Sequence, residues 1–469
     1  MHVRRQFLGE SPARLFLSLV IVAFGASTAG AQLRPAEVFV GSESEEYLRY
    51  LQSAGAVPLY PWSIRGFSPS EIDRLMPTDS GHPWQVERPQ LTGDRSPLTI
   101  SLIRPSLTTY FNSAFPFGYN DGAVWQGKGF TTALSLGVQA RYGPVWLNVA
   151  PLAFMAQNAG FDLQDNGHTD TLRFAHGQIP TNIDAPQRFG DGAYTVLDPG
   201  QSTFGVDLGP VAAGASTANQ HWGPAVDHPI VLGNNAAGFT HVFAGTAKPL
   251  DLWLFKVHGR AVWGDLRQSD FTLNPDSLSR RYMSGVVGVI QPRGVPGLEL
   301  GAGRFFHADW PGDGLTTRDL WKPFESVLKI NLPVPPSGDL ERRDSDNQVA
   351  SAWLRWVFPR SGFELYGEWG KEDHNWDLRD LILEPDHESG YTLGFRKLWN
   401  RSPAGFWALR AEQMNLQYSQ IIRGRQQSQF YRHSSTRQGH TQRGQILGSD
   451  FGVGGSATTV RLERYHQAG

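Results

Sequence analysis

Three histidines within one turn-rich stretch are the first candidates for chemistry. The stretch QHWGPAVDHPIVLGNNAAGFTHV runs from residue 220 to 242 and carries His221, His228 and His241. Zinc needs several ligands that converge in tetrahedral geometry. These histidines follow neither an H-x-H nor an H-E-x-x-H pattern, and prolines separate them. The sequence therefore predicts loop histidines that form hydrogen bonds, and it predicts no metal and no cofactor.

A pair of carboxylates is the next candidate, because glycoside hydrolysis uses two of them. Glu364 and Glu368 share one face of a predicted strand, and four residues of strand would place them ~13 Å apart. The carboxyl groups of glycosidases lie only about 5 to 9.5 Å apart. We therefore expect salt bridges with the interior arginines Arg355, Arg396 and Arg410 rather than a catalytic pair.

Serine nucleophiles have no better support. The chain contains no G-x-S-x-G motif, which would place a serine on a nucleophile elbow. The stretch GHTQRGQILGSDFG offers His440 and Ser449 without a spacing that brings them together. Phosphate-binding glycine loops are also absent from the sequence. The sequence predicts no catalytic residue, and a membrane-embedded hydrolase is left as an alternative without support.

Two clusters join tryptophan to charged residues. FHADWPGDG places Asp309 beside Trp310, and KEDHNWDLRD places Trp376 beside Asp377 and Arg379. An aromatic ring stacks on the apolar face of a sugar, while carboxylates and guanidinium groups form directional hydrogen bonds with hydroxyls and uronates. These five residues are the predicted ligand contacts. The alternative for each tryptophan is an anchor at a membrane interface, with solvated neighbours.

The segments that must position these residues alternate with period two. In FTTALSLGVQARYGPVWLNV, which spans 130–149, apolar side chains form one face and polar or small ones the other, with a turn at Gly143 and Pro144. The same pattern recurs in DLWLFKVHGRAVW, VASAWLRWVFPRSGFELYGEWG and YTLGFRK, and aromatic residues gather towards the strand ends. Such segments are antiparallel strands with one apolar face.

Composition favours a membrane barrel over a soluble sandwich. The chain has 52 glycines, 15 tryptophans and no cysteine, which suits an exported barrel with aromatic girdles and a crowded polar interior. We predict an all-β protein, a transmembrane antiparallel β-barrel over residues 97–469, with about 18 strands at roughly 20 residues per strand and connection; 16 is the alternative. The net charge of −2 argues against nucleic acid as a partner.

The sequence pattern of residues 32–96 predicts helices rather than strands. Ser42 and Glu45 have capping-box spacing and Gly55 ends the predicted helix, whereas Ser68 begins a second helix that has Pro69 in its first turn. Two such short helices bury little surface by themselves. We therefore expect a small helical module that docks on the barrel.

Residues 1–31 have the sequence features of a signal peptide. Three arginines precede an apolar run from Leu15 to Phe24, and Ala29 and Ala31 fit a cleavage site. The run is too short for a membrane helix, which needs roughly 20 residues, and fits the core of a cleaved signal. The sequence predicts cleavage after Ala31 and export by the general secretory route.

Several stretches resemble the Wzi-type capsule-assembly proteins of the bacterial outer membrane. The most distinctive are WGP followed by NN within a dozen residues, and ELYGEWGKED; the similarity continues through GHTQRGQILGSDFGVGG and covers nearly all of the mature chain. The resemblance implies an 18-stranded barrel with a helical bundle at its periplasmic end. It also implies a non-enzymatic, lectin-like role at the cell surface, with capsular or exopolysaccharide, outer-membrane lipid and other export components as partners.

The resemblance suggests a role for the turn-rich stretch with which this section began. We expect it to fold into or across the barrel as a structural plug, with His221 and Trp222 facing the lumen. Asn234 and Asn235 would satisfy backbone groups that water cannot reach. A porin or solute-specific channel is the alternative function, and it would require an open path through the lumen instead.

Overall fold

Strands are the dominant regular element of the chain. A computed structural model describes residues 32–467, except 79, 94–95, 327, 333–345, 373–376 and 419–427. The predicted signal peptide, residues 1–31, lies outside the described residues, as does Trp376. Among the described residues, no helix is both long and apolar enough to cross a lipid bilayer.

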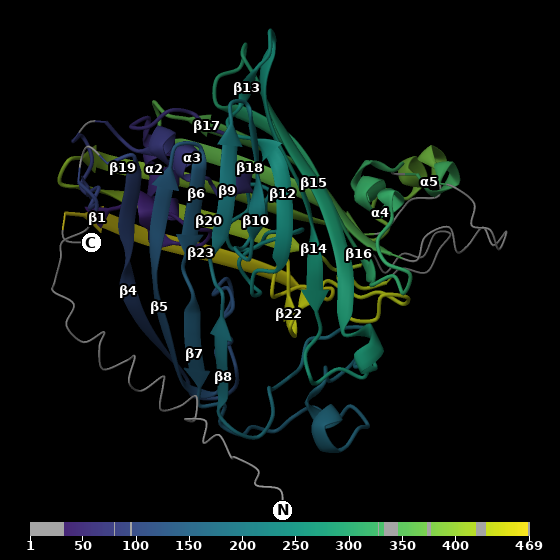
Figure 1. The fold of residues 1–469 in the computed structure, drawn as a ribbon. Coiled ribbons are helices and arrows are strands. Elements are labelled where there is room, and N and C mark those ends of the chain that lie inside the picture. The colour runs from purple at the N-terminus through teal and green to yellow at the C-terminus, as the bar shows by residue number, and fades with distance from the viewer. Residues whose placement is uncertain are drawn as a thin grey trace, which may run out of the picture.

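One large antiparallel sheet dominates the fold (Figure 1). Its strands are β4 (Leu98–Asn112), β5 (Gly129–Tyr142), β6 (Val145–Val149), β7 (Leu152–Ala156), β8 (Tyr194–Asp198), β9 (Thr203–Leu208), β10 (Val211–Ser216), β12 (Thr240–Thr246), β13 (Leu250–Asp251), β14 (Phe255–Arg267), β15 (Arg280–Pro292), β16 (Leu298–Asp309), β17 (Asn347–Phe358), β18 (Phe363–Glu372), β19 (Ser389–Ser402), β20 (Gly405–Asn415) and β23 (Ser456–His466). The prediction of an all-β protein is confirmed.

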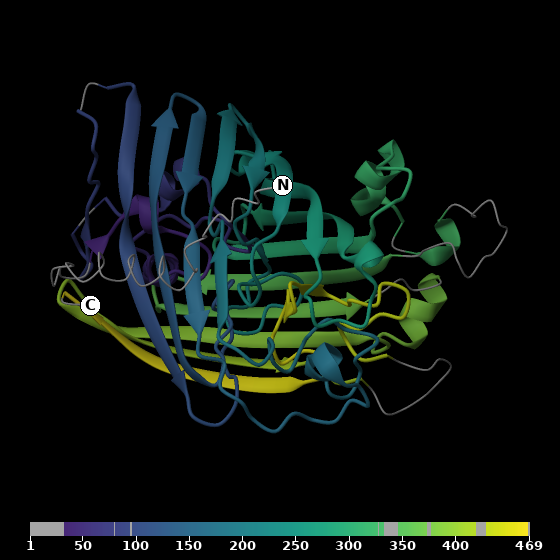
Figure 2. The same cartoon turned by 60° about the horizontal axis from the view of Figure 1, so that its bottom comes forward.

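The strands follow one another around the sheet almost in chain order. β6 and β7 both pair with β5 on one side, and on the other side β6 pairs with β9 and β7 with β8. β6 and β7 therefore act as one interrupted strand, and β8 and β9 as another. The sheet curls until β23 comes next to β4 (Figure 2), although the described residues give no register between these two strands. Closure at this seam and the count of about 18 strands therefore stay predictions. We call the enclosed interior the lumen.

The alternation along the strands separates a polar interior from an apolar exterior. In β18, Glu364, Tyr366 and Glu368 are buried on the inside, whereas the outward Trp369 is 41% exposed. This is the pattern that the sequence predicts for a strand between a lumen and an apolar environment.

The predicted helices lie where their capping residues place them. α2 (Glu43–Ala54) begins after Ser42, whose side chain accepts a hydrogen bond from the Glu45 N–H, and it ends at Gly55 with φ of 78°. α3 (Pro69–Leu75) begins after Ser68 with a complete capping box. Both helices are confirmed. The other helices among the described residues are the short α4 (Thr317–Trp321) and α5 (Leu378–Leu383), and short 3-10 helices at Pro35–Glu37, Asp170–Phe174, Asp276–Leu278, Lys322–Phe324 and Lys329–Asn331.

The described residues also form three small two-stranded sheets. β1 (Gln32–Leu33) pairs with β3 (Gln85–Val86), β2 (Ile64–Arg65) with β11 (His221–Trp222), and β21 (Thr441–Gln442) with β22 (Gln445–Ile446). The β2–β11 pair joins the helical segment to the turn-rich stretch, and it therefore ties two distant parts of the chain together.

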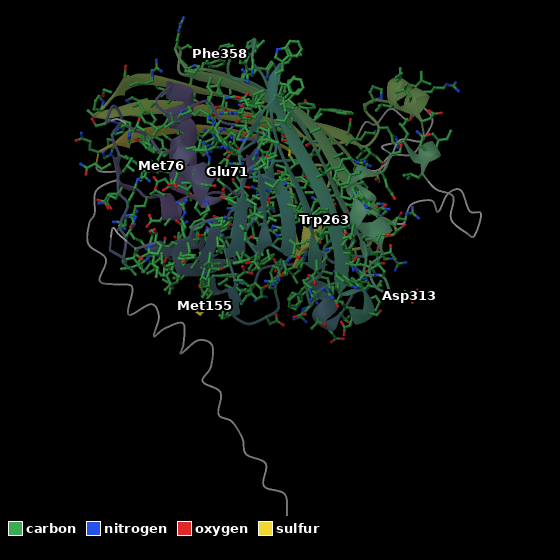
Figure 3. All side chains as sticks on the ribbon, turned by 45° about the horizontal axis from the view of Figure 1, so that its top comes forward. Glu71, Met76, Met155, Trp263, Asp313 and Phe358 are labelled. Atoms are coloured by element: carbon green, nitrogen blue, oxygen red, sulfur yellow. The ribbon has the colours of Figure 1, made fainter. Side chains whose placement is uncertain are left out.

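The two ends of the curled sheet differ in their connections. Short turns at 143–144, 209–210, 293–297, 359–362 and 403–404 form the short-turn end, and the connections 113–128, 157–193, 217–239, 310–346, 373–388 and 416–455 form the long-loop end. α2 and α3 lie inside the ring near the short-turn end (Figure 1), where Arg401 Nη1 donates to the Ala54 carbonyl at 3.1 Å. In Figure 3, Phe358 marks the short-turn end and Asp313 the opposite end.

Candidate functional site

A buried ion-pair network joins α2 to the wall. Arg49 Nη2 lies 2.6 Å from Glu364 Oε1, and Arg355 Nε lies 3.0 Å from the same oxygen. Arg355 also pairs with Glu299 at 3.3 Å, and Glu299 accepts hydrogen bonds from the backbone N–H groups of residues 62 and 63. All four charged side chains are almost completely buried. Because an unpaired charge in such an interior costs several kcal/mol, this network fixes the helix against β16, β17 and β18.

A second network connects α2 to the turn-rich stretch. Glu46 pairs with Arg396 at 2.7 Å and with Arg410, and Arg410 in turn pairs with Asp227 at 3.0 Å. Arg461 reaches the other oxygen of Asp227 at 3.0 Å. Burial alone would raise the pKa of Glu46, but the arginine charges outweigh it and lower this pKa to about 2. Glu46 is therefore charged at neutral pH.

The expectation that the β18 glutamates pair with Arg355, Arg396 and Arg410 is correct only in part. Arg355 pairs with Glu364 as predicted. Arg396 and Arg410, however, are bound by Glu46 of α2 rather than by a glutamate of β18. The Glu368 carboxylate faces Gly223 instead, close enough that a Cβ added there would lie 2.4 Å from Oε2. The strand pattern alone could not predict this arrangement, because the carboxylate partner of both arginines lies on α2.

The first two residues predicted for the plug lie deep in the lumen. His221 is 1% exposed and Trp222 is completely buried, and together they form β11, which pairs with β2 of the helical segment. The Trp222 ring packs edge-on against Phe305 at 6.1 Å between ring centres. It fills a notch in the wall, because a Cβ at Gly285 would lie 2.6 Å from the indole.

The two asparagines tie the same stretch to other loops. Asn234 Nδ2 donates to the Asn120 carbonyl at 2.8 Å, and Asn235 Nδ2 donates to the Ile446 carbonyl at 2.9 Å. Gln445 Nε2 returns a hydrogen bond to the Asn235 carbonyl at 3.2 Å. Both asparagines thus satisfy backbone carbonyls in segments from the long-loop end.

The other two histidines of the stretch form contacts that are separate from each other. His228 Nε2 lies 2.8 Å from Thr459 Oγ1, and His241 Nδ1 lies 2.8 Å from the Phe239 carbonyl oxygen. Over the part of the chain that the structure describes, no group of three or more histidine, aspartate or glutamate side chains could hold a metal ion. The stretch has the contacts of a structural element.

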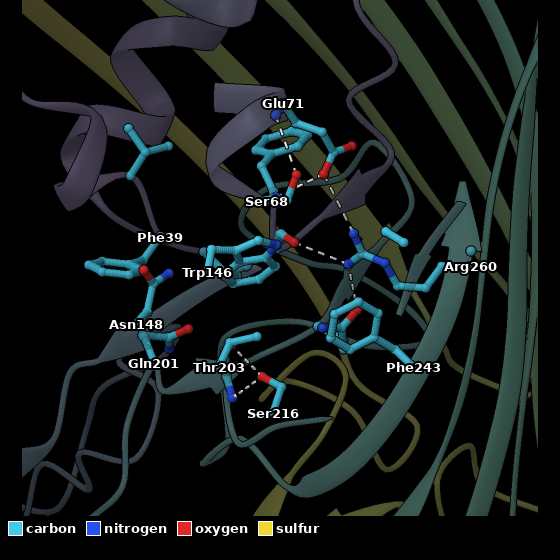
Figure 4. Close-up of a pocket in the computed structure, with 18 of the residues that line it drawn as sticks. Phe39, Ser68, Glu71, Trp146, Asn148, Gln201, Thr203, Ser216, Phe243 and Arg260 are labelled. Carbon is cyan, nitrogen blue, oxygen red and sulfur yellow. Dashed lines mark hydrogen bonds and ion pairs between the residues drawn. The ribbon is translucent and has the colours of Figure 1, made fainter. Parts of the chain in front are cut away.

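A small cavity beneath α3 is too narrow for a polymer (Figure 4). Its volume is about 40 Å³, which is room for only a few waters. Glu71 lies at its roof, 3.2 Å from His258 Nε2 and 3.8 Å from Arg260 Nη2, and Arg260 Nη1 also donates to Gln220 at 3.0 Å. The cavity is part of the joint between the helices and the wall.

The first predicted sugar cluster lies where β16 meets the long-loop end. Trp310 is half-buried, and the Arg280 guanidinium covers one face of its ring at 3.6 Å, while Tyr282 meets it edge-on. Asp309 is also half-buried, and its Oδ1 has no hydrogen-bond partner among the described residues. One face of the tryptophan is therefore already used.

The second predicted cluster lies at α5. Arg379 is exposed and Asp377 is half-buried, while Trp376 lies outside the described residues. Figure 1 shows α4 and α5 projecting beside the long-loop end. The described residues establish no contact between this cluster and Trp310, so the structure does not join the two clusters into one site.

Sequence reasoning missed Glu46, Arg49 and Asp227, which hold the interior together. Glu45, Arg49 and Gln52 are all buried on α2, so the available signal was a short helix that carries four charged residues, Glu43, Glu45, Glu46 and Arg49, among its tyrosines and leucines. Such a helix cannot lie on an apolar surface and must meet complementary charges.

The sequence matches one protein family over most of its length. A model of the family described as capsule assembly protein Wzi matches residues 112–468. No curated protein matches the chain.

Solved structures extend the comparison. Wzi of Escherichia coli, described as an outer membrane protein involved in group 1 capsule assembly and as a carbohydrate-binding β-barrel, is similar with 14% identity and a TM-score of 0.56, over 92% of this chain and 82% of that chain. OmpT, an outer membrane protein of Vibrio cholerae, has 10% identity and a TM-score of 0.31 over 80% of this chain and 99% of that chain. The first similarity shows a shared fold, and the second is too weak to support an argument.

Proposed function

The chain belongs to the Wzi capsule-assembly family, and we propose that it binds capsular or exopolysaccharide at the cell surface as a non-enzymatic, lectin-like barrel. The protein lies in the bacterial outer membrane. An unpaired strand edge in lipid leaves backbone groups without partners. We therefore expect β4 and β23 to pair in the membrane and to close a barrel, for which about 18 strands remains our proposal.

The presence of α2 and the stretch 217–239 inside the lumen is the observation that supports this role most. α2 is bound to the wall from the short-turn end through Arg49 and Glu364. The stretch 217–239 crosses the interior behind it, with Trp222 in the wall notch, and the β21–β22 hairpin meets that stretch from the long-loop end through Asn235. A porin needs a water-filled path, so this arrangement favours binding over conduction.

The orientation follows from the connections. Barrels of this kind have short periplasmic turns and longer extracellular loops, which supports a periplasmic location for the helical module of residues 32–96. The polymer would then contact the long-loop end. Trp310, Asp309, Asp377 and Arg379, together with Trp376, stay our proposed sugar contacts there, and other polysaccharide-export components stay proposed partners. Cleavage of residues 1–31 is likewise a proposal.

Capsule retention in a clean deletion strain tests the function. We expect the total polysaccharide to stay constant while the polymer shifts from the cells to the medium, because anchoring rather than synthesis is lost. Reintroduction of the intact gene should restore attachment. Unchanged attachment would overturn the proposal, and steady ion conductance by the purified protein in a planar bilayer would support the porin alternative instead.

A further inference from the structure

A cavity at the long-loop end differs from both predicted sugar clusters. It has a volume of about 220 Å³, and four separate connections converge on it, through residues 116–126, 185–187, 235 and 444–450. The polar and aromatic side chains of the lining are those of Phe117, Trp125, Gln126, Gln187, Asn235, Gln445 and Asp450. The cavity is thus a concave surface built by residues far apart in the sequence.

The walls of this cavity are held in place before any ligand arrives. The Trp125 ring packs edge-on against Phe189 at 5.0 Å. The turn of the β21–β22 hairpin contacts the same region, since a Cβ at Gly444 would lie 2.9 Å from Pro186 and 3.0 Å from Phe189. A preformed pocket loses little conformational entropy when it binds a ligand.

The polar groups of the cavity suit hydroxyl groups. Gln126 Nε2 donates to Asp121 Oδ2 at 2.6 Å, and Gln445 Nε2 donates to the Asn235 carbonyl. Each of these amides keeps a second N–H and an acceptor oxygen, so each can both donate to and accept from a sugar hydroxyl. Phe117 is 53% exposed and offers an aromatic face for the apolar side of a sugar ring.

The charge of the lining selects between kinds of sugar. Among the described residues that line the cavity, Asp450 is the one with a charged side chain, and arginine and lysine are absent. A carboxylate accepts hydrogen bonds from hydroxyls but repels a uronate. We infer that this cavity, which we call the amide pocket, binds an uncharged hexose unit of the polysaccharide rather than an acidic one.

This inference rests on the proposed function, and it assigns the amide pocket as a subsite that the Trp310 and Trp376 clusters do not include. A uronate of the same polymer would then bind elsewhere, where guanidinium groups such as that of Arg379 are exposed. The amide pocket would thus bind the neutral sugar units of the polymer.

Ligand-observed saturation-transfer NMR on the purified full-length protein in detergent tests the inference. The probes are methyl α-glucoside, methyl β-galactoside and methyl α-mannoside as neutral sugars, and sodium glucuronate as the acidic one. We expect transfer to at least one neutral glycoside and little transfer to glucuronate. The substitution Phe117→Ala should weaken the neutral interaction by roughly three- to tenfold, as expected for loss of one stacked ring.

Two matched controls separate the pocket from its surroundings. Phe115 is 59% exposed in the same connection but does not line the cavity, so Phe115→Ala should leave transfer unchanged. Asp450→Asn should reduce discrimination against glucuronate, whereas Asp313→Asn, at an exposed aspartate outside the pocket, should not.

Three outcomes would overturn the inference: stronger transfer to glucuronate, equal effects of Phe117→Ala and Phe115→Ala, or no transfer to any neutral glycoside. None of them contradicts the proposed function by itself, because polymer retention by cells measures anchoring independently. Loss of retention in the deletion strain together with any of these outcomes would leave the anchoring role intact and assign recognition to another surface.

Discussion

Arg49 of α2 and Glu364 of β18 form a completely buried ion pair of 2.6 Å, although 315 residues separate them in the chain. Arg49 also donates to the Pro224 carbonyl at 2.7 Å. One guanidinium therefore joins the helix, the wall and the stretch that crosses the lumen.

Replacing one partner of this pair should destabilise the protein strongly. Arg49→Gln leaves Glu364 buried with less compensation, and we expect a loss of about 3 to 5 kcal/mol in the free energy of unfolding. Urea unfolding of the protein in detergent measures the loss. Arg88→Gln is the matched control, because the Arg88–Asp73 pair is exposed and should contribute less than about 1 kcal/mol. Equal effects would show that the buried pair does not hold the helix.

The notch that receives Trp222 gives a second prediction. Gly285→Ala places a methyl group 2.6 Å from the indole, and we expect a loss of about 1 to 3 kcal/mol from overpacking. Gly288→Ala on the same strand is the control, since a Cβ there meets its nearest atom at 3.9 Å. Thermal unfolding compares the two variants. Adding Trp222→Leu to Gly285→Ala should cost less than the sum of the single changes, and strict additivity would contradict the contact.

Local sequence signals predicted the helices and strands well, whereas contacts between residues far apart in the sequence could not be predicted. The caps at Ser42 and Ser68 depend on residues within one helical turn, so the sequence contains the whole signal. The partner of Arg396 and Arg410 could not be predicted from neighbouring residues, because Glu46 is about 350 residues away in the sequence and contacts them only through the position of α2 in the lumen.

The candidate sites show the same limit. Trp310 was identified by its neighbours in sequence, but the Arg280 side chain that covers its ring comes from the adjacent strand β15. The amide pocket was missed altogether, because its residues come from four connections. Aromatic and glutamine residues in PFGYNDGAVWQGKG were a signal only in retrospect.

The pH dependence of docking should follow Glu46. Its pKa is about 2 in the folded protein, against an ordinary value of 4.5. A lowered folded-state pKa stabilises the fold fully above pH 4.5, and this stabilisation is lost as the pH falls towards 2. Urea unfolding midpoints should therefore fall between about pH 6 and about pH 3. Glu46→Gln should reduce this slope, whereas an unchanged slope would assign it to other groups.

The Trp310 cluster predicts a loss of polymer binding without a loss of fold. Trp310→Ala removes a half-buried ring with one face already occupied by Arg280, and we expect polysaccharide affinity to fall by roughly three- to tenfold if the other face stacks on sugar. Trp253→Ala is the control, because Trp253 is 87% exposed at the short-turn end. Binding of surface polysaccharide from the same bacterium to the purified variants is the measurement. Equal loss in both variants would remove Trp310 from the site.

Two separate elements occupy the lumen, so we expect conductance only after the loss of both. Deletion of 32–96 removes α2 and α3, but 217–239 still crosses the interior, held by Trp222 in its notch and by the hydrogen bonds of Asn234 and Asn235. We expect no steady current from this variant in a planar bilayer. Further replacement of residues 220–236 by a short glycine–serine linker should open a path, because the polar wall would then face water. Steady current after removal of the helices alone would show that the crossing stretch does not seal the lumen.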